Sequence, residues 1–308
     1  MEEKRVQELD ELDIQILSML LDNCREPDRQ IGKRIGISGN TVKSRIQKMI
    51  QNKVIEKFTL KIEPPVLGYN VLYIVVSGQD LNQILKQVRL IGEPFFVVPC
   101  VGDVTVCSIV IKENVKAKIE LAKKIMKDIR VLSIFEAQNP GIRSDLTKTD
   151  LEIINVLLEN PRARIDEIAK TTSLSTKTIT RSLDKLQNDE AILFTLIYDP
   201  IKLEQFVPYA ILTWINGDLG KTLEILKEEF SQSFLQKPFV AKNQIVLFLY
   251  SDNIFKIDDV IQRVRKISGI ALADLFIPKK ITLPQKWVAD TVKTARASKK
   301  LHLLYQTS

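Results

Sequence analysis

The stretch ISGNTVKSRIQKMIQNKVI at residues 37 to 55 decides the fold, because a second version of it, LSTKTITRSLDKLQNDEAI, stands at residues 174 to 192. Shifting the sequence by 137 positions aligns residues 9 to 55 with residues 146 to 192, and no gap is needed. Thirteen of these 47 aligned positions are identical, among them Asp13 with Asp150 and Thr41 with Thr178. The chain therefore contains one structural unit twice.

Each copy has the apolar spacing of three helices. In the first copy, apolar residues recur at helical intervals over residues 12 to 21, and Ile31 and Ile35 mark a short second helix. Ser38 is a favourable N-cap for a third helix, as Ser175 is in the second copy. The few residues left for the turn predict a helix-turn-helix, whose second helix can lie in the major groove of DNA. Trihelical units also serve as protein docking modules, so periodicity alone leaves both functions open.

The outward side of the third helix favours DNA, because its side chains can pair with base edges or phosphates. The predicted DNA-binding residues are Ser38, Asn40, Thr41, Lys43, Ser44, Arg45, Gln47 and Lys48 in the first copy, and Lys177, Thr180 and Arg181 in the second.

The distribution of charge also favours DNA, and it favours the first copy over the second. Residues 29 to 57 hold eight bases against Glu56 alone, whereas residues 1 to 28 hold nine acids against three bases. Residues 166 to 194 of the second copy hold four bases against five acids. A basic cluster confined to one helical pair is the electrostatic footprint of a phosphate-binding face. We therefore expect the first copy to be the stronger reader.

The segment after each unit has the order strand, helix, two-stranded hairpin, helix and strand, over residues 71 to 138 and again over residues 209 to 277. This is the ferredoxin-like βαββαβ pattern, with Gly102-Asp103 and Lys242-Asn243 at the hairpin turns. The predicted fold class is α+β, with a pseudo-two-fold repeat in one chain. Winged helix-turn-helix domains at residues 1–62 and 141–199 alternate with ferredoxin-like domains at residues 63–140 and 200–278, and a basic C-terminal tail occupies residues 279–308.

These residues resemble the Lrp/AsnC, or feast/famine, family of bacterial and archaeal transcription regulators. The resemblance covers residues 9 to about 277, and its motif residues are Leu9, Asp10, Asp13, Ile16, Leu17, Asn23, Arg25, Ser38, Thr41, Val42, Arg45 and Ile46. It implies a winged helix-turn-helix that binds double-stranded DNA and a ligand-sensing βαββαβ domain through which protomers dimerise. Two such protomers would stand on one chain here, and further self-association is expected beyond that intrachain pseudo-dimer. Two different recognition helices on one chain would prefer an asymmetric site, unless the chain dimerises and pairs first copy with first copy.

Two departures from the family pattern concern the DNA reader. Where the family usually has Gly-Val-Ile after the third helix, this chain has Lys53-Val54-Ile55 and Glu190-Ala191-Ile192, so an easy left-handed C-cap is missing. Ser182 replaces the motif arginine in the second copy, which predicts a weaker grip on phosphate there.

The resemblance also implies a site for an amino acid effector near the hairpin of the sensing domain, around Gly102, Asp103 and Thr105. Thr105 stands where the family carries an aspartate, and the loss of that anion removes a strong partner for a ligand ammonium group. The effector is therefore left open between an amino acid, another small molecule and none.

Two alternative functions, a nonspecific architectural chromatin protein and a sirohaem decarboxylase, are judged by residues of the C-terminal tail. Residues 279 to 300 hold seven bases against Asp290 alone. They form either an arm along the duplex, as in a nonspecific architectural chromatin protein, or a helix that packs Trp287 and Val292 on the body. Chains of this architecture also resemble sirohaem decarboxylases, in which histidine and arginine side chains handle the tetrapyrrole carboxylates. This chain has one histidine, His302, which lies in the tail.

Other sequence features predict neither catalysis nor a cofactor. The three cysteines, Cys24, Cys100 and Cys107, are expected to be buried free thiols, since an odd count in a chain of this size does not indicate a disulfide framework. One histidine supports neither a catalytic triad nor a histidine-rich metal site, so we expect no enzyme, no metal and no cofactor. The charged N-terminal residues and the absence of an apolar run of about 18 residues predict a cytoplasmic protein that does not interact with membranes.

Overall fold

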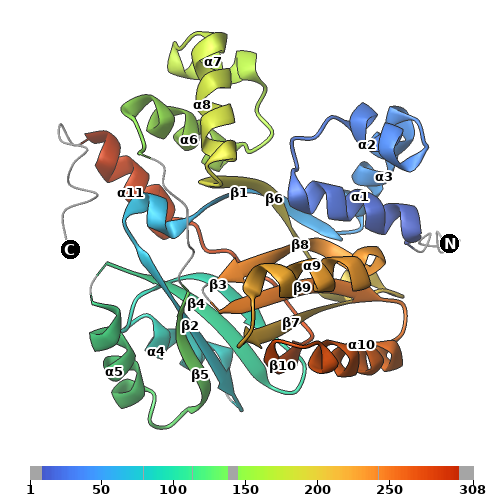
Figure 1. Cartoon of the computed structure of the whole chain (residues 1–308). Coiled ribbons are helices and arrows are strands. Elements are labelled where there is room, and N and C mark those ends of the chain that lie inside the picture. Colours follow the sequence, from blue (N-terminus) through green and yellow to red (C-terminus); the bar gives the residue numbers. More distant parts are fainter. Residues whose placement is uncertain (1–8, 79, 113, 138–144, 242, 298–308) are drawn as a thin grey trace, which may run out of the picture. The chain divides into compact units, whose positions relative to one another are not determined.

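The chain divides into two compact units, each built from two separate parts of the sequence. The structure is a computed structural model that describes residues 9–78, 80–112, 114–137, 145–241 and 243–297 (Figure 1). Unit 1 comprises Met1–Lys57 with Tyr198–Pro278, and unit 2 comprises Phe58–Ile197 with Lys279–Ser308. The first helix-turn-helix therefore shares a unit with the second ferredoxin-like domain, and the second helix-turn-helix with the first.

The first helix-turn-helix has the three predicted helices, which are α1 (Glu11–Asp22), α2 (Asp28–Ile35) and α3 (Gly39–Gln51). A capping box starts α1, because the Asp10 carboxylate accepts from the Asp13 amide while the Asp13 carboxylate accepts from the Asp10 amide. Ser38 caps α3 as predicted, with its hydroxyl accepting from the Thr41 amide at 3.0 Å. These local bonds satisfy amides that have no partner inside the helix.

The second helix-turn-helix repeats this construction in α6 (Lys148–Glu159), α7 (Ile165–Thr172) and α8 (Thr176–Asn188). Its capping box joins Thr147 and Asp150, and Ser175 caps α8 by accepting from the Thr178 amide at 3.1 Å. The three-helix prediction is confirmed in both copies.

Both recognition helices end in a left-handed residue although neither has glycine at that position. The backbone φ angle is 59° at Lys53 and 52° at Glu190. The amides of Lys53 and Val54 donate to the carbonyls of Ile50 and Met49 at 3.0 and 2.8 Å, which is the Schellman pattern of hydrogen bonds. A residue with a Cβ is strained in this region, so the left-handed conformation at the end of each recognition helix costs free energy of folding.

The first ferredoxin-like domain follows the predicted βαββαβ order. Its elements are β2 (Asn70–Ser77), α4 (Leu81–Val88), β3 (Glu93–Pro99), β4 (Val104–Ile111), α5 (Val115–Ile125) and β5 (Arg130–Ala137). The antiparallel sheet has the order β3-β4-β2-β5, and α4 and α5 cover one of its faces (Figure 1). Ile74 and Ile109 of the sheet pack there with Val88 and Ala122 of the helices.

The second ferredoxin-like domain has the same topology. Its elements are β7 (Val207–Ile215), α9 (Leu219–Glu229), a 3-10 turn η3 (Ser231–Ser233), β8 (Phe234–Ala241), β9 (Gln244–Ser251), α10 (Ile254–Lys266) and β10 (Ile270–Phe276). The strand order is β10-β7-β9-β8, which matches that of the first domain strand for strand. The β8 strand starts at Phe234, directly after η3.

A two-stranded ribbon connects the helix-turn-helix segments to the ferredoxin-like segments along the chain. It consists of β1 (Ile55–Ile62) and β6 (Ile192–Tyr198), which pair with each other. The Glu63 amide donates to the Ala191 carbonyl at 3.0 Å in unit 2, and the Asp199 amide donates to the Val54 carbonyl at 2.9 Å in unit 1. Short 3-10 turns, η1 (Pro64–Leu67) and η2 (Pro200–Leu203), then lead into the sheets.

The C-terminal segment of unit 2 forms a strap, defined here as residues 279–297, that ends in α11 (Lys286–Ala297). Val97 of β3 and Thr282 exchange two backbone hydrogen bonds of 2.9 and 3.0 Å. The Gln285 side chain donates to the Thr59 hydroxyl at 2.7 Å and to the Leu60 carbonyl at 2.6 Å. The strap is thereby tied to β3 and to the β1 half of the ribbon.

The inner side of α11 is apolar and packs on α6 and on the first ferredoxin-like domain. Trp287 is only 6% exposed, and its ring meets Tyr69 and Phe95 edge-on at centroid distances of 5.2 and 6.2 Å. Val292 is fully buried. The described part of the tail therefore follows the packing alternative, while residues 298–308, including His302, lie outside the described residues.

The cysteines and the helix lengths agree with the sequence analysis. Cys24, Cys100 and Cys107 are buried and none forms a disulfide, as predicted, and burial raises the pKa of both Cys100 and Cys107 to about 12. Within the described ranges, the helices are too short or too polar to span a bilayer.

Candidate nucleic-acid interface

Most predicted reading residues of the first copy lie on the exposed side of α3. Asn40, Lys43, Ser44 and Gln47 are all exposed, while Val42, Ile46 and Met49 face the core of the helical unit. Helical geometry places positions 40, 43, 44 and 47 on one face, since they are three or four residues apart. This exposed row offers an amide, an ammonium, a hydroxyl and a second amide, which are groups able to pair with base edges.

Ser38, Thr41 and Lys48 occupy less direct positions. The hydroxyls of Ser38 and Thr41 lie 2.8 Å apart and take part in the N-cap, so their first role is to start the helix. Lys48 is half-buried in the last turn of α3. Contacts from these three residues to DNA stay a prediction.

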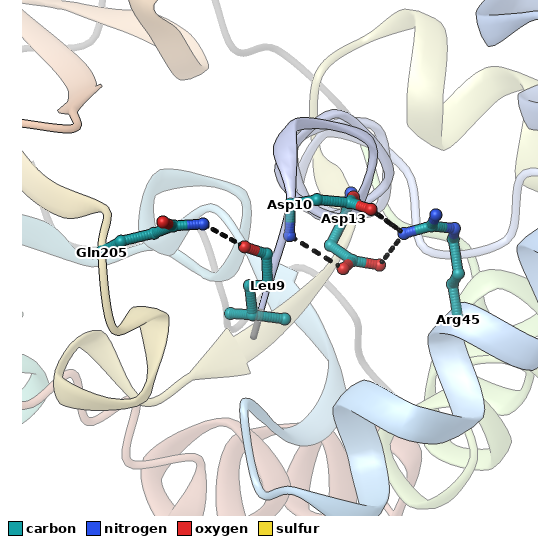
Figure 2. A network of polar contacts seen from close by, with 5 residues as sticks. All are labelled: Leu9, Asp10, Asp13, Arg45 and Gln205. Carbon is teal, nitrogen blue, oxygen red and sulfur yellow. Dashed lines mark hydrogen bonds and ion pairs between the residues drawn. The ribbon is translucent and has the colours of Figure 1, made fainter. Parts of the chain in front are cut away.

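Arg45 turns back toward α1, as Figure 2 shows. Its Nη1 donates to Asp10 at 2.8 Å and to Asp13 at 2.9 Å. The side chain of Arg45 is 23% exposed and that of Asp13 only 1%. Its guanidinium neutralises a buried carboxylate and ties the recognition helix to the capping box of α1. A contact from Arg45 to DNA stays a prediction.

The ionisation of this clasp, the Asp10–Asp13–Arg45 group, reflects its mutual pairing. Burial opposes the charge on Arg45, but hydrogen bonds with Asp13 and Asp10 outweigh it and raise the pKa of the guanidinium. Burial likewise raises the pKa of Asp10, and the bond from Arg45 with those from nearby amides lowers it to a net value below the usual one. Both partners therefore stay charged at neutral pH.

The second copy builds an equivalent clasp from other residues. Ser182, which aligns with Arg45, donates to Asp150. Lys185, which aligns with Lys48, donates to Asp150 at 2.8 Å and to the Asp145 carbonyl at 2.9 Å. The replacement of arginine by Ser182 therefore exchanges one internal partner of the aspartate for another. A weaker grip on phosphate in the second copy stays a prediction.

The predicted residues of α8 are exposed, and two of them carry a positive charge. Lys177, Thr180 and Arg181 all lie at the surface. The Thr180 hydroxyl donates back to the Thr176 carbonyl of its own helix at 3.0 Å. Asp184, which aligns with Gln47, adds a negative charge to the same face.

The first helix-turn-helix docks on the second ferredoxin-like domain through polar groups that the sequence pattern did not reveal. The Gln205 amide donates to the Leu9 carbonyl (Figure 2), and the Tyr250 hydroxyl donates to Glu11 at 3.1 Å. Lys237 of β8 pairs with Asp22 at 3.9 Å. These partners are about two hundred residues apart in sequence, so no local signal links them.

A polar groove of about 360 Å³ runs along this junction, where the α1–α2 loop and α2 face Lys237. Its lining includes Asp22, Arg25, Glu26 and Arg34, and the Arg34 guanidinium pairs with Glu26. Burial raises the pKa of Asp22, and the nearby Lys237 only partly opposes this. The junction is therefore a polar contact, in contrast with the apolar contact of α11.

The three predicted effector residues are divided between surface and core. Gly102 and Asp103 form the exposed hairpin turn, with left-handed φ angles of 78° and 55°. Thr105 is buried in β4, where it lies opposite Val76 of β2 and Pro99 of β3. Only the turn is presented to solvent, so an effector role for Thr105 stays a prediction.

Comparison with known proteins identifies both helical units. Residues 9–50 match the AsnC-type helix-turn-helix domain, and residues 146–193 match a winged helix-turn-helix DNA-binding domain. An uncharacterized HTH-type transcriptional regulator from Pyrococcus furiosus is 27% identical over 147 residues, which is 47% of this chain and 98% of that protein. The HTH-type transcriptional regulator Ptr1 from Methanocaldococcus jannaschii is 28% identical over 127 residues, covering 40% of this chain and 86% of that protein.

Solved structures of similar chains fall into two groups. The siroheme decarboxylase NirDL is 12% identical and covers 92% of this chain and 99% of its own, with a TM-score of 0.49. AsnC from E. coli is 22% identical and covers 45% of this chain and 98% of its own, with a TM-score of 0.31.

Proposed function

This chain is a DNA-binding transcriptional regulator of the Lrp/AsnC family in tandem-duplicated form, and we propose that its first helix-turn-helix supplies most of the sequence recognition. The observation that carries this proposal is the exposed row of Asn40, Lys43, Ser44 and Gln47 on α3. Each well-made contact from such a side chain to a base edge is worth about 1 to 3 kcal/mol of discrimination.

The surroundings of the row support the same proposal. Arg29, Lys33 and Arg34 of α2 are exposed beside α3, and they add positive charge to the reader. The corresponding helix α7 exposes two acids, Asp166 and Glu167, and one base, Lys170. Cationic side chains supply most of the sequence-independent affinity for DNA, so the first reader has the larger share of it.

Two substitutions, one on each recognition helix, test the proposal. Duplexes selected by the wild-type protein from a random pool serve as probes, and binding is followed by fluorescence anisotropy at fixed salt. Lys43→Ala is expected to weaken binding about 5- to 100-fold, because the variant has no ammonium group at the base edges. Arg181→Ala on α8 is the matched control and is expected to weaken binding less. A larger effect from Arg181→Ala would assign the dominant role to the second reader.

Effector control is the second part of the proposed function. Membership of the family supports an amino acid or another small molecule at a βαββαβ domain, with the exposed Gly102-Asp103 turn as one contact. Thermal unfolding of the protein with each of the twenty amino acids is the direct assay, since a ligand that binds the folded state raises the melting temperature. Loss of this increase in the Asp103→Ala variant would locate the binding site at the turn.

Self-association and the absence of catalysis complete the proposal. Leu132 of the edge strand β5 is 47% exposed and Leu272 of the edge strand β10 is 51% exposed, which supports contact between copies. Light scattering during gel filtration measures the assembly. The single histidine argues against a tetrapyrrole decarboxylase, and an unchanged absorption spectrum of a tetrapyrrole mixed with the protein is the expected result.

A further inference from the structure

The outer side of α11 is a basic ridge, defined here as Lys286, Lys293 and Arg296. All three side chains are exposed, while Trp287, Val288, Thr291, Val292 and Ala295 are buried on the opposite side. With 100° between successive residues, positions 286 and 293 lie almost in line and position 296 lies next to them. Asp290 is the one acidic residue of α11, so the ridge keeps a net positive charge.

The ridge is held in a fixed position relative to the second helix-turn-helix. The α11 helix packs directly on α6 of that reader, and both belong to unit 2. The hydroxyls of Tyr69 and Thr291 lie 2.9 Å apart on the buried side, and the bonds of Gln285 fix the start of the helix. An ordered helix presents its cations without the loss of conformational freedom that a disordered arm suffers on binding.

The second reader has fewer basic residues of its own than the first. Residues 166 to 194 hold four bases against five acids, and one of the four, Lys185, is paired with Asp150. Residues 29 to 57 of the first reader hold eight bases, and six are left when Arg34 and Arg45, which pair with acidic residues, are set aside. Elements outside the recognition helix commonly add contacts to DNA, as the N-terminal arm of homeodomains does in the minor groove.

We propose that the basic ridge of α11 is a phosphate-binding surface that completes the DNA grip of the second helix-turn-helix. The partner is the sugar-phosphate backbone of duplex DNA, and the contact is independent of base sequence. This proposal rests on the DNA-binding function, and it gives the C-terminal helix a second role beyond packing. The second reader then contributes affinity through α11 more than discrimination through α8.

The test measures the salt dependence of DNA binding by the full-length protein. The ridge variant carries Lys286→Gln, Lys293→Gln and Arg296→Gln. The matched control carries Lys116→Gln, Lys124→Gln and Lys127→Gln, three exposed residues on or just after α5 of the same unit, so that both variants lose three charges. Dissociation constants are measured between 50 and 300 mM KCl (roughly the range in which phosphate contacts dominate) on a selected duplex and on an unrelated duplex of equal length.

The ridge variant is expected to reduce the slope of log K against log salt by about 0.9 for each phosphate that is no longer neutralised, hence by about 2 to 3, on both duplexes. The α5 control is expected to keep the wild-type slope. A ridge variant with the wild-type slope overturns the proposal, and so does an equal reduction in the control, which would point to net charge alone. A further variant with Lys286→Arg and Lys293→Arg is expected to keep the wild-type slope; a reduced slope there would indicate a packing defect instead.

Failure of the proposed function gives a different result. If the wild-type protein binds neither duplex, DNA binding itself is refuted and the ridge proposal falls with it. If the wild type binds DNA and the ridge substitutions leave the salt dependence unchanged, the proposed function stands and the assignment of the ridge is refuted.

Discussion

The guanidinium of Arg45 donates to the buried carboxylate of Asp13 at 2.9 Å, and this bond joins the recognition helix to the first helix of its own domain (Figure 2). The same guanidinium contacts Asp10, the residue that caps α1. Three residues of the family motif are therefore explained by one internal ion-pair cluster. The orientation of the reading face depends on this cluster, because α3 is tied to α1 through it.

Arg45→Ala is expected to destabilise the protein by about 3 kcal/mol. The substitution leaves the Asp13 carboxylate buried without its cationic partner, which is strongly unfavourable. Urea unfolding followed by circular dichroism measures the change in stability, and the double variant Asp13→Ala, Arg45→Ala is expected to be destabilised by less than the sum of the single changes. An unchanged midpoint together with weaker DNA binding would show that Arg45 contacts DNA after all.

Lys53→Gly is expected to stabilise the first reader by about 0.5 to 1 kcal/mol. Glycine adopts the left-handed conformation at the end of α3 without the steric cost of a Cβ, although its flexible unfolded state offsets part of the gain. Glu190→Gly at the end of α8 is expected to behave in the same way. Gly36→Ala is the opposite control, since it places a Cβ at a φ angle of 76° and should destabilise. Denaturation midpoints decide the matter, and lower midpoints for both glycine variants would contradict the prediction.

Trp287→Ala is expected to cost about 3 to 5 kcal/mol in unit 2, because it removes a large buried ring from the strap. The chain has two tryptophans, and the other, Trp214 of β7, lies in unit 1. Fluorescence of Trp214 in the variant therefore follows unit 1 during unfolding, while circular dichroism follows both units. We expect an early transition in the dichroism signal with little shift in the Trp214 signal. Unfolding of both units at one lowered midpoint would mean that the strap stabilises the whole chain.

Acid is expected to weaken the second helix-turn-helix through Asp150. Burial raises the pKa of Asp150, but bonds from Lys185, Ser182 and Thr147 outweigh it and the net pKa lies below the usual value. The unfolded chain then binds the proton more readily than the folded one, so this contribution to stability is present above about pH 4 and disappears as the pH falls through the lowered pKa.

The matched variant for this pH effect is Asp150→Asn, which keeps the shape of the side chain. The difference in unfolding free energy between wild type and variant should be largest near about pH 6. It should shrink toward about pH 2.5, because the Asp150 carboxylate of the folded protein then increasingly binds a proton. Urea titrations at several pH values supply the data. A difference that stays constant with pH would show that Asp150 acts through its hydrogen bonds alone.

Local features of the sequence correctly predicted the helices, their N-caps and the order of strands and helices along the chain, because each of these depends on neighbours within a few residues. The internal ion pair of Arg45 was not predicted, although helical geometry gives a reason for it. Position 45 follows Val42 by three residues and precedes Met49 by four, so it borders the buried side of α3. Its aligned residue Ser182 is buried, and the acidic partner Asp13 is shared with the second copy as Asp150.

The sequence by itself determined that one reader and one sensing domain occur twice, since periodicity, capping residues and the internal alignment are properties of short segments. Only the tertiary structure decided which copies share a unit: Glu11 meets Tyr250, and Trp287 meets Tyr69. Those pairings join residues more than two hundred positions apart, and they depend on the complementarity of folded surfaces. Covalent order does not encode that choice, because both readers have the same scaffold and both sheets have the same topology.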